Sequence, residues 1–128
     1  MTEDDDQASA AQRLLELSTR LGVKYIFANL GSDHPAFIEA FARLHERGEP
    51  MPQVVICPHE MTALSAAHGY AMLTRRPQLV LVHVDVGTQN LGGSVHNAAR
   101  GRIPAIIVAG LSPLTDGTER VGARNAAG

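Results

Sequence analysis

Short apolar runs alternate along the chain with longer segments of mixed character. The runs fall at residues 25–28, 54–56, 78–84 and 104–109, and within them apolar residues follow one another instead of alternating with polar ones. Continuous apolar runs of about four to eight residues are typical of strands buried on both faces of a sheet. The pattern therefore predicts buried strands at these positions.

The segments between the runs have the apolar spacing of helices. Helices are expected at 9–21, 36–47, 60–74 and 90–100, with a loop at 85–89, and glycines at 22 and 48 end the first two. Strands alternating with helices indicate an α/β fold, a doubly wound parallel sheet of five or six strands with helices on both faces. The residues expected to face inward are Leu14, Leu17 and Leu21 in the first helix and Phe37, Ile38, Phe41 and Leu44 in the second.

The domain organisation follows from where this periodicity stops. Residues 1–8 are acidic and polar and are expected to be a disordered tail, residues 9–112 form one domain, and residues 113–128 form an irregular tail that begins a truncated linker. The chain of 128 residues is long enough for one compact core and too short for two.

Composition narrows the class of partner. Apolar residues make up 45% of the chain, charged residues 19%, and the net charge is −2, so neither nucleic acid nor an anionic membrane is expected to bind. The longest apolar runs, 79–84 and 103–109, are far shorter than the roughly 20 residues of a membrane helix. A cytoplasmic protein is expected. The single cysteine, Cys57, excludes an internal disulfide and is expected to be a small buried hydrophobe.

Glu60 is the leading candidate for chemistry. Pro58 ends the second strand, so Glu60 falls in the first turn of the next helix, at the strand end where open α/β sheets bind ligands. A structural role is the alternative, because a glutamate there faces the positive end of the helix dipole. Small residues such as Ala63 and Ala67 indicate that this helix is buried, and a buried carboxylate without a cation tends to keep its proton.

Three further patterns have open alternatives. The loop Gly87 to Gly93 follows a strand as phosphate loops do, but it lacks both the dinucleotide and the P-loop spacing, so its glycines also suit close helix packing. His83 at a strand end suits either a site or a hydrogen-bonded structural histidine. No metal site is expected, because position 63, where a zinc protease has its second histidine, is alanine.

Taken in order, these pieces resemble a known family. The segments His59-Glu60 to Gly69-Tyr70-Ala71, Gly87 to Asn90, Asn97-Ala98, and Ile103-Pro104 with the strand to Gly110 resemble the N-terminal, pyrimidine-binding domain of thiamine diphosphate enzymes of the acetolactate synthase and benzoylformate decarboxylase group. The resemblance covers about residues 12–110.

The resemblance implies roles for individual residues. It makes Glu60 the residue that hydrogen-bonds the aminopyrimidine of thiamine diphosphate and favours its imino form. His83 matches a catalytic histidine of the benzoylformate decarboxylase branch, although Leu30 replaces a proline and Asp85 stands where relatives have small residues. The implied cofactor-binding residues are Asn29, Gly31, Glu60, Gly87 and Asn90, and the implied substrate residues are Ser32 and His34.

The resemblance also implies partners. The family binds the diphosphate through Mg²⁺ with a Gly-Asp-Gly…Asn segment on another domain, which this sequence lacks. A 2-keto acid substrate, a diphosphate-binding domain or subunit, and a homo-oligomer (dimer or tetramer) are therefore expected, with a fragment of a longer enzyme preferred over one subunit of a split enzyme. The alternatives are a non-catalytic interaction or regulatory subunit and a free-standing nucleotide-binding domain.

Overall fold

A parallel sheet organises the computed structural model, which describes residues 8–111. Its four strands are β1 (Tyr25–Ala28), β2 (Gln53–Ile56), β3 (Leu79–Val82) and β4 (Ile106–Ala109), in the order β2-β1-β3-β4. All three pairings are parallel, so the predicted α/β class with a doubly wound sheet is confirmed. Four strands replace the expected five or six within the described part. Residues 1–7 of the predicted tail at 1–8 and all of the predicted tail at 113–128 lie outside the described residues.

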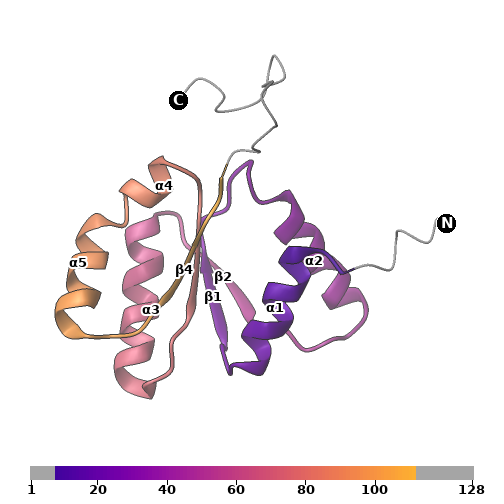
Figure 1. Cartoon of the computed structure of the whole chain (residues 1–128), viewed down its shortest axis with the longest axis horizontal. Coiled ribbons are helices and arrows are strands. Elements are labelled where there is room, and N and C mark those ends of the chain that lie inside the picture. Colours follow the sequence, from indigo (N-terminus) through magenta and orange to yellow (C-terminus); the bar gives the residue numbers. More distant parts are fainter. Residues whose placement is uncertain (1–7, 112–128) are drawn as a thin grey trace, which may run out of the picture.

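Helices cover both faces of the sheet (Figure 1). Helices α1 (Ala10–Arg20) and α2 (Pro35–Glu46) lie on one face, and α3 (Glu60–Thr74) and α5 (Gly92–Gly101) on the other. A short helix, α4 (Val86–Gln89), occupies most of the segment expected to be a loop. Among residues 8–111, no helix has the length and apolar character needed to cross a bilayer.

The two central strands divide the core between the faces. In β3 all four residues are fully buried, and successive side chains point to opposite faces. Leu79 and Leu81 pack with α1 and α2, while Val80 and Val82 pack with α3. The buried alanines of α3, which bring that helix close to the sheet, are Ala63, Ala67 and Ala71.

The outer strands are less buried than their sequence predicts. Strand β2 lies at an edge of the sheet, Val54 and Val55 are half-buried, and Ile56 is 64% exposed. The prediction of a fully buried strand at 54–56 is therefore wrong. An apolar run indicates that a segment is a strand. The place of that strand in the sheet depends on pairing with segments that are distant in the chain, and the local sequence does not reveal this pairing.

The helix faces also differ from expectation. Helix α1 buries Ala11, Leu15 and Ser18, whereas Leu17 and Leu21 are exposed, so the predicted Leu14, Leu17 and Leu21 face is wrong. In α2, Leu44 is buried as expected but Ile38 is exposed. Close packing between α1 and α2 favours the face with small residues over the one with more leucines.

A buried glutamine fixes the amino ends of β1 and β3. Gln78 has no exposed surface, and its Oε1 accepts from the backbone N–H groups of Lys24 (2.9 Å) and Tyr25 (2.8 Å). Its Nε2 donates to the carbonyls of Arg76 and Pro77. One side chain thus satisfies four backbone groups, and the cost of leaving them unpaired in the core is avoided.

Candidate functional site

The polar loops that follow the strands meet at the carboxyl edge of the sheet. Backbone hydrogen bonds continue each strand into its loop: Asn29 N–H donates to the Leu81 carbonyl, and Cys57 N–H donates to the Ala28 carbonyl. Cys57 is buried and free, as expected. The loops after β1, β2 and β3 are therefore held side by side at the position where open α/β sheets bind ligands.

Glu60 lies at the centre of this edge, between two asparagines. It begins α3, as predicted, and His59 caps the helix by accepting from Met61 N–H through Nδ1 at 3.1 Å. Glu60 Oε1 accepts from Asn29 Nδ2 at 2.9 Å, and Oε2 accepts from Asn90 Nδ2 at 3.0 Å. The residue is only 6% exposed. Each carboxylate oxygen is thus oriented by one amide from a neighbouring loop.

These hydrogen bonds decide the charge of Glu60. Burial raises the pKa of its carboxyl group, but hydrogen bonds from Asn90, from its own backbone N–H and from Asn29 lower the pKa by more, with a smaller contribution from His59. The net shift is downward, so Glu60 is ionised at neutral pH. The expectation that burial would keep it protonated is wrong, because donors from two other loops stabilise the anion.

Gly87 packs closely against Glu60 and His83. A Cβ at position 87 would lie 3.2 Å from Glu60 Oε1 and 3.2 Å from the Cβ of His83. Such contacts are tighter than side chains normally make, so any larger residue would press on both groups. The absence of a side chain at position 87 therefore lets this loop approach both the Glu60 carboxylate and His83.

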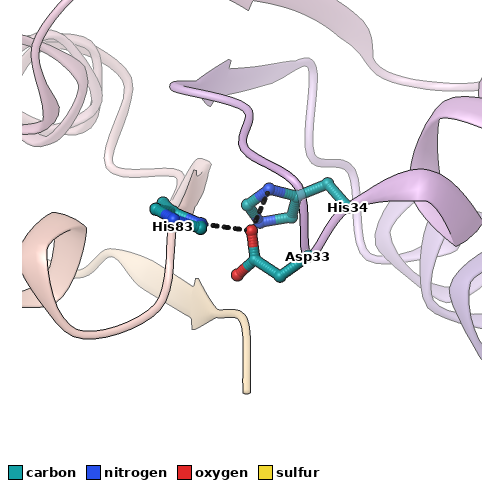
Figure 2. Close-up of side chains that lie close together, drawn as sticks. All are labelled: Asp33, His34 and His83. Carbon is teal, nitrogen blue, oxygen red and sulfur yellow. Dashed lines mark hydrogen bonds and ion pairs between the residues drawn. The ribbon is translucent and has the colours of Figure 1, made fainter. Parts of the chain in front are cut away.

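His83 and Asp33 form a hydrogen-bonded pair (Figure 2). His83 Nδ1 donates to Asp33 Oδ1 in a short hydrogen bond, and Asp33 Oδ2 accepts from the backbone N–H of Val84 at 2.9 Å. Burial raises the pKa of Asp33, whereas the hydrogen bonds from His83 and Val84 lower it, and the net shift is downward. Asp33 was absent from the sequence-predicted site, because an acid in a Gly-Ser-Asp loop is equally typical of a turn.

His34 is an anchor for the loop rather than an exposed polar group. It is fully buried, its Nδ1 accepts from Gly31 N–H at 2.9 Å, and its Nε2 lies 3.1 Å from the Val82 carbonyl. Because a carbonyl only accepts, Nε2 carries the proton and both ring nitrogens are occupied. The same Val82 oxygen accepts from Gly110 N–H at 3.1 Å. Substrate contact by His34, which the resemblance predicts, does not fit this burial.

The remaining predicted residues lie around this pair. Ser32 is exposed on the loop after β1, and Gly31 faces the His83 ring so closely that a Cβ there would overlap it. Asp85 is exposed with φ 49° and ψ −85°, a conformation that few residues other than glycine adopt. Site roles for Ser32, Gly31 and Gly87 stay predictions.

Asp33, His34 and His83 also bring metal-type ligands together. In the part of the chain that the structure describes, their ligand atoms lie within 4.8 Å of one another. However, His34 Nε2 donates its proton to a carbonyl and Nδ1 accepts from a backbone N–H, so neither nitrogen has a lone pair to offer. Two ligands remain, fewer than metal sites in proteins normally use. The cluster is explained by hydrogen bonding.

Comparison with protein families gives one match that spans the site. Residues 8–125 match the family described as thiamine pyrophosphate enzyme, N-terminal TPP binding domain. Every strand, helix and loop described above falls inside the matched segment.

Known proteins and solved structures agree with this match. The chain is 33% identical over 102 residues to a candidate acetolactate synthase large subunit of Mycobacterium tuberculosis, and it is 30% identical over 95 residues to benzoylformate decarboxylase of Pseudomonas aeruginosa. These alignments cover 80% and 74% of this chain but only 19% and 17% of the relatives. A solved structure of a candidate thiamin diphosphate-dependent enzyme from Mycobacterium smegmatis superposes with a TM-score of 0.69 at 31% identity, covering 82% of this chain and 19% of that one.

Proposed function

The chain belongs to the family of N-terminal thiamine pyrophosphate-binding domains, and from this we propose that it is the pyrimidine-binding part of a thiamine diphosphate-dependent 2-keto acid decarboxylase or carboligase. Glu60 is proposed to activate the cofactor. The observation that carries the proposal is the Glu60 carboxylate, which is ionised and held by Asn29 and Asn90 at the carboxyl edge of the sheet.

The residues around Glu60 fit the pyrimidine of the cofactor. A carboxylate has about four acceptor positions, and two are used by the asparagines, so Glu60 retains capacity to accept from a protonated ring nitrogen. Gly87 has no side chain to press on Oε1, so the loop after β3 packs against Glu60 without displacing its carboxylate. When bound, thiamine diphosphate would supply an electron sink for the carbanion left when a 2-keto acid loses carbon dioxide. This chain would hold the ring and its proton in place.

His83 is proposed to serve the substrate end of the site. It lies beside Gly87, as Glu60 does, its side chain is 32% exposed, and an imidazole can act as a general acid or base. Replacing it, as in His83→Ala, should impair decarboxylation while cofactor affinity stays nearly unchanged. A loss of cofactor affinity equal to the loss of rate would contradict this placement.

The rest of the proposal concerns the whole enzyme, because the matched part of this chain covers only 19% and 17% of the two relatives. A second domain or subunit would bind the diphosphate through Mg²⁺, and the domain would assemble as a homo-oligomer. A 2-keto acid would be the substrate. The free, buried Cys57 is compatible with the reducing conditions of a cytoplasmic location, which forms part of the proposal.

The Glu60→Gln variant of the assembled holoenzyme tests the role of Glu60. Glutamine keeps the shape of the side chain but removes the charge, so exchange of the cofactor C2 proton for deuterium should slow by about 100-fold or more. Nuclear magnetic resonance of quenched samples measures this exchange. The matched control is Glu39→Gln on α2, where Glu39 is exposed and pairs only with Arg43 among the contacts described.

Two results would overturn the proposal. One is C2 exchange in Glu60→Gln at the wild-type rate, which would remove Glu60 from cofactor activation. The other is wild-type holoenzyme that assembles but does not exchange C2 at all, which would favour a non-catalytic interaction subunit.

A further inference from the structure

We propose that Asp33 is a positioning residue that fixes the tautomer of His83, so that Nδ1 carries the proton and Nε2 is presented to the substrate. The inference rests on the proposed function, in which His83 serves the substrate end. It concerns a contact between two loops that are 50 positions apart in the chain.

The two oxygens of the Asp33 carboxylate have different hydrogen-bond partners. Oδ2 is fixed by the N–H of Val84, the residue directly after His83, so the carboxylate moves with the backbone of that loop. Oδ1 then faces His83 Nδ1 (Figure 2). Because the pKa of Asp33 lies below its ordinary value, the group is an anion at neutral pH and can only accept. His83 Nδ1 must therefore be the donor.

The other nitrogen of His83 is consequently available. Within residues 8–111, Nε2 has no hydrogen-bond partner, and the side chain is 32% exposed, in contrast to 7% for Asp33. In the neutral ring, Nε2 has a lone pair and accepts a proton; in the cation, it donates one, and Asp33 stabilises that charge. The pair thus matches the general arrangement in which a buried carboxylate orients an imidazole for acid–base work.

Glycines on two loops make room for this pair. A Cβ at Gly110, directly after β4, would collide with the Asp33 carboxylate, and a Cβ at Gly31 would collide with the His83 ring. Positions 31 and 110 therefore accept only glycine while the pair is in place. A hydrogen bond enclosed on both sides in this way cannot rotate freely, which is what a fixed tautomer requires.

Other ionisable groups near His83 do not replace Asp33. His34 has its ring centroid 6.4 Å from that of His83, and its Nδ1 also lies 3.1 Å from Asp33 Oδ1, but the hydrogen bonds of its two nitrogens are with backbone groups. Glu60 is held by its asparagines on the other side of Gly87. Asp85 is exposed, and the structure gives it no bond to His83 within the described residues. Asp33 is thus the acceptor that fixes the tautomer of the His83 ring.

The tautomer is measured directly by ¹⁵N nuclear magnetic resonance of histidine-labelled holoenzyme, with His83→Gln used to assign the His83 signals. We expect wild-type His83 to be protonated at Nδ1 when neutral. Asp33→Asn should lose this preference, because an amide can face the ring with either its oxygen or its nitrogen. The matched control, Asp85→Asn, removes a nearby charge but no hydrogen bond and should leave the tautomer unchanged.

Kinetics then separates positioning from folding. Asp33→Asn should lower kcat for the keto acid by about tenfold or more, change its KM little, and alter the pH profile, while C2 exchange of the cofactor stays near the wild-type rate. Equal losses in C2 exchange and kcat would mean general damage to the site and would overturn the proposal. So would an Nε2-protonated neutral His83 in the wild type, a result that needs no folded variant.

The tautomer experiment does not depend on turnover. If wild-type holoenzyme lacked C2 exchange, the proposed function would fail while the Asp33–His83 result still stood. If Glu60→Gln behaved as expected but His83 were protonated at Nε2, the role of Asp33 alone would fail.

Discussion

Asn29 and Glu60 are 31 positions apart in the chain, yet Asn29 Nδ2 donates to Glu60 Oε1 at 2.9 Å. Together with Asn90 on the far oxygen, this contact ties the loops after β1 and β3 to the start of α3. Both contacts stabilise the charged form of Glu60. The charged form of the central acid is therefore stabilised by two neighbouring loops in addition to its own backbone N–H.

Removing one of these donors should raise the pKa of Glu60. In Asn90→Ala the anion loses a hydrogen bond, so the acid limb of the pH profile for C2 exchange should move to higher pH. A hydrogen bond to a charged group is worth about 1.5–3 kcal/mol, so the exchange rate near the limb should fall by about tenfold or more. Asn97→Ala, an exposed asparagine on α5, is the control. An unshifted limb would show that Asn90 does not stabilise the anion.

Gly110→Ala should separate Asp33 from His83. The new methyl group would occupy the place of the Asp33 carboxylate, which would have to leave its hydrogen bonds with His83 and Val84 to avoid the overlap. The variant should therefore show the mixed His83 tautomers of Asp33→Asn in ¹⁵N spectra. Gly69→Ala, on α3 where a Cβ meets nothing, is the matched control. An unchanged spectrum for Gly110→Ala would contradict the close approach.

Gln78→Leu should destabilise the fold without changing the candidate site. The substitution leaves the N–H groups of Lys24 and Tyr25 without their acceptor, at about 1–3 kcal/mol for each buried group. We expect the free energy of unfolding to fall by about 3 kcal/mol in urea titrations, while turnover per folded molecule is retained. Gln53→Leu on the exposed edge of β2 should change stability far less.

Acid should weaken the fold through Asp33 and Glu60. Both have a lowered pKa in the folded state, so each contributes stability that is fully present above the ordinary carboxyl pKa of about 4 and is lost as the pH falls through the lower, folded value. Urea midpoints measured from pH 7 to pH 3 should fall less steeply in Asp33→Asn and Glu60→Gln than in the wild type. Parallel curves would show that neither group is linked to folding.

The sequence predicted the strands and helices well because their signals are local. Continuous apolar runs identified all four strands, and the proline at 58 placed Glu60 at the start of α3. Ser9 Oγ caps α1 by accepting from the backbone N–H of Gln12 at 3.2 Å. What the sequence did not predict were the edge position of β2 and the buried face of α1, which depend on packing between distant segments.

The residues of the candidate site could likewise be predicted only in part. Residue types at strand ends indicated Glu60 and His83, the family resemblance added Asn29 and Asn90, and the structure brings these four to one edge. Asp33 was missed because its partner is 50 positions away, and its only local signal is an acid next to a serine in a strand-end loop. His34, by contrast, looked polar and accessible although the fold buries it completely.

The Val82 carbonyl accepts from both His34 Nε2 and Gly110 N–H. Since the shared atom belongs to the main chain, the contact survives any exchange of the side chain at position 82 that keeps the strand intact. In related sequences, substitutions at position 82 would preserve the two hydrogen bonds to this carbonyl. Loss of the imidazole at position 34 would instead release the loop that carries Asp33.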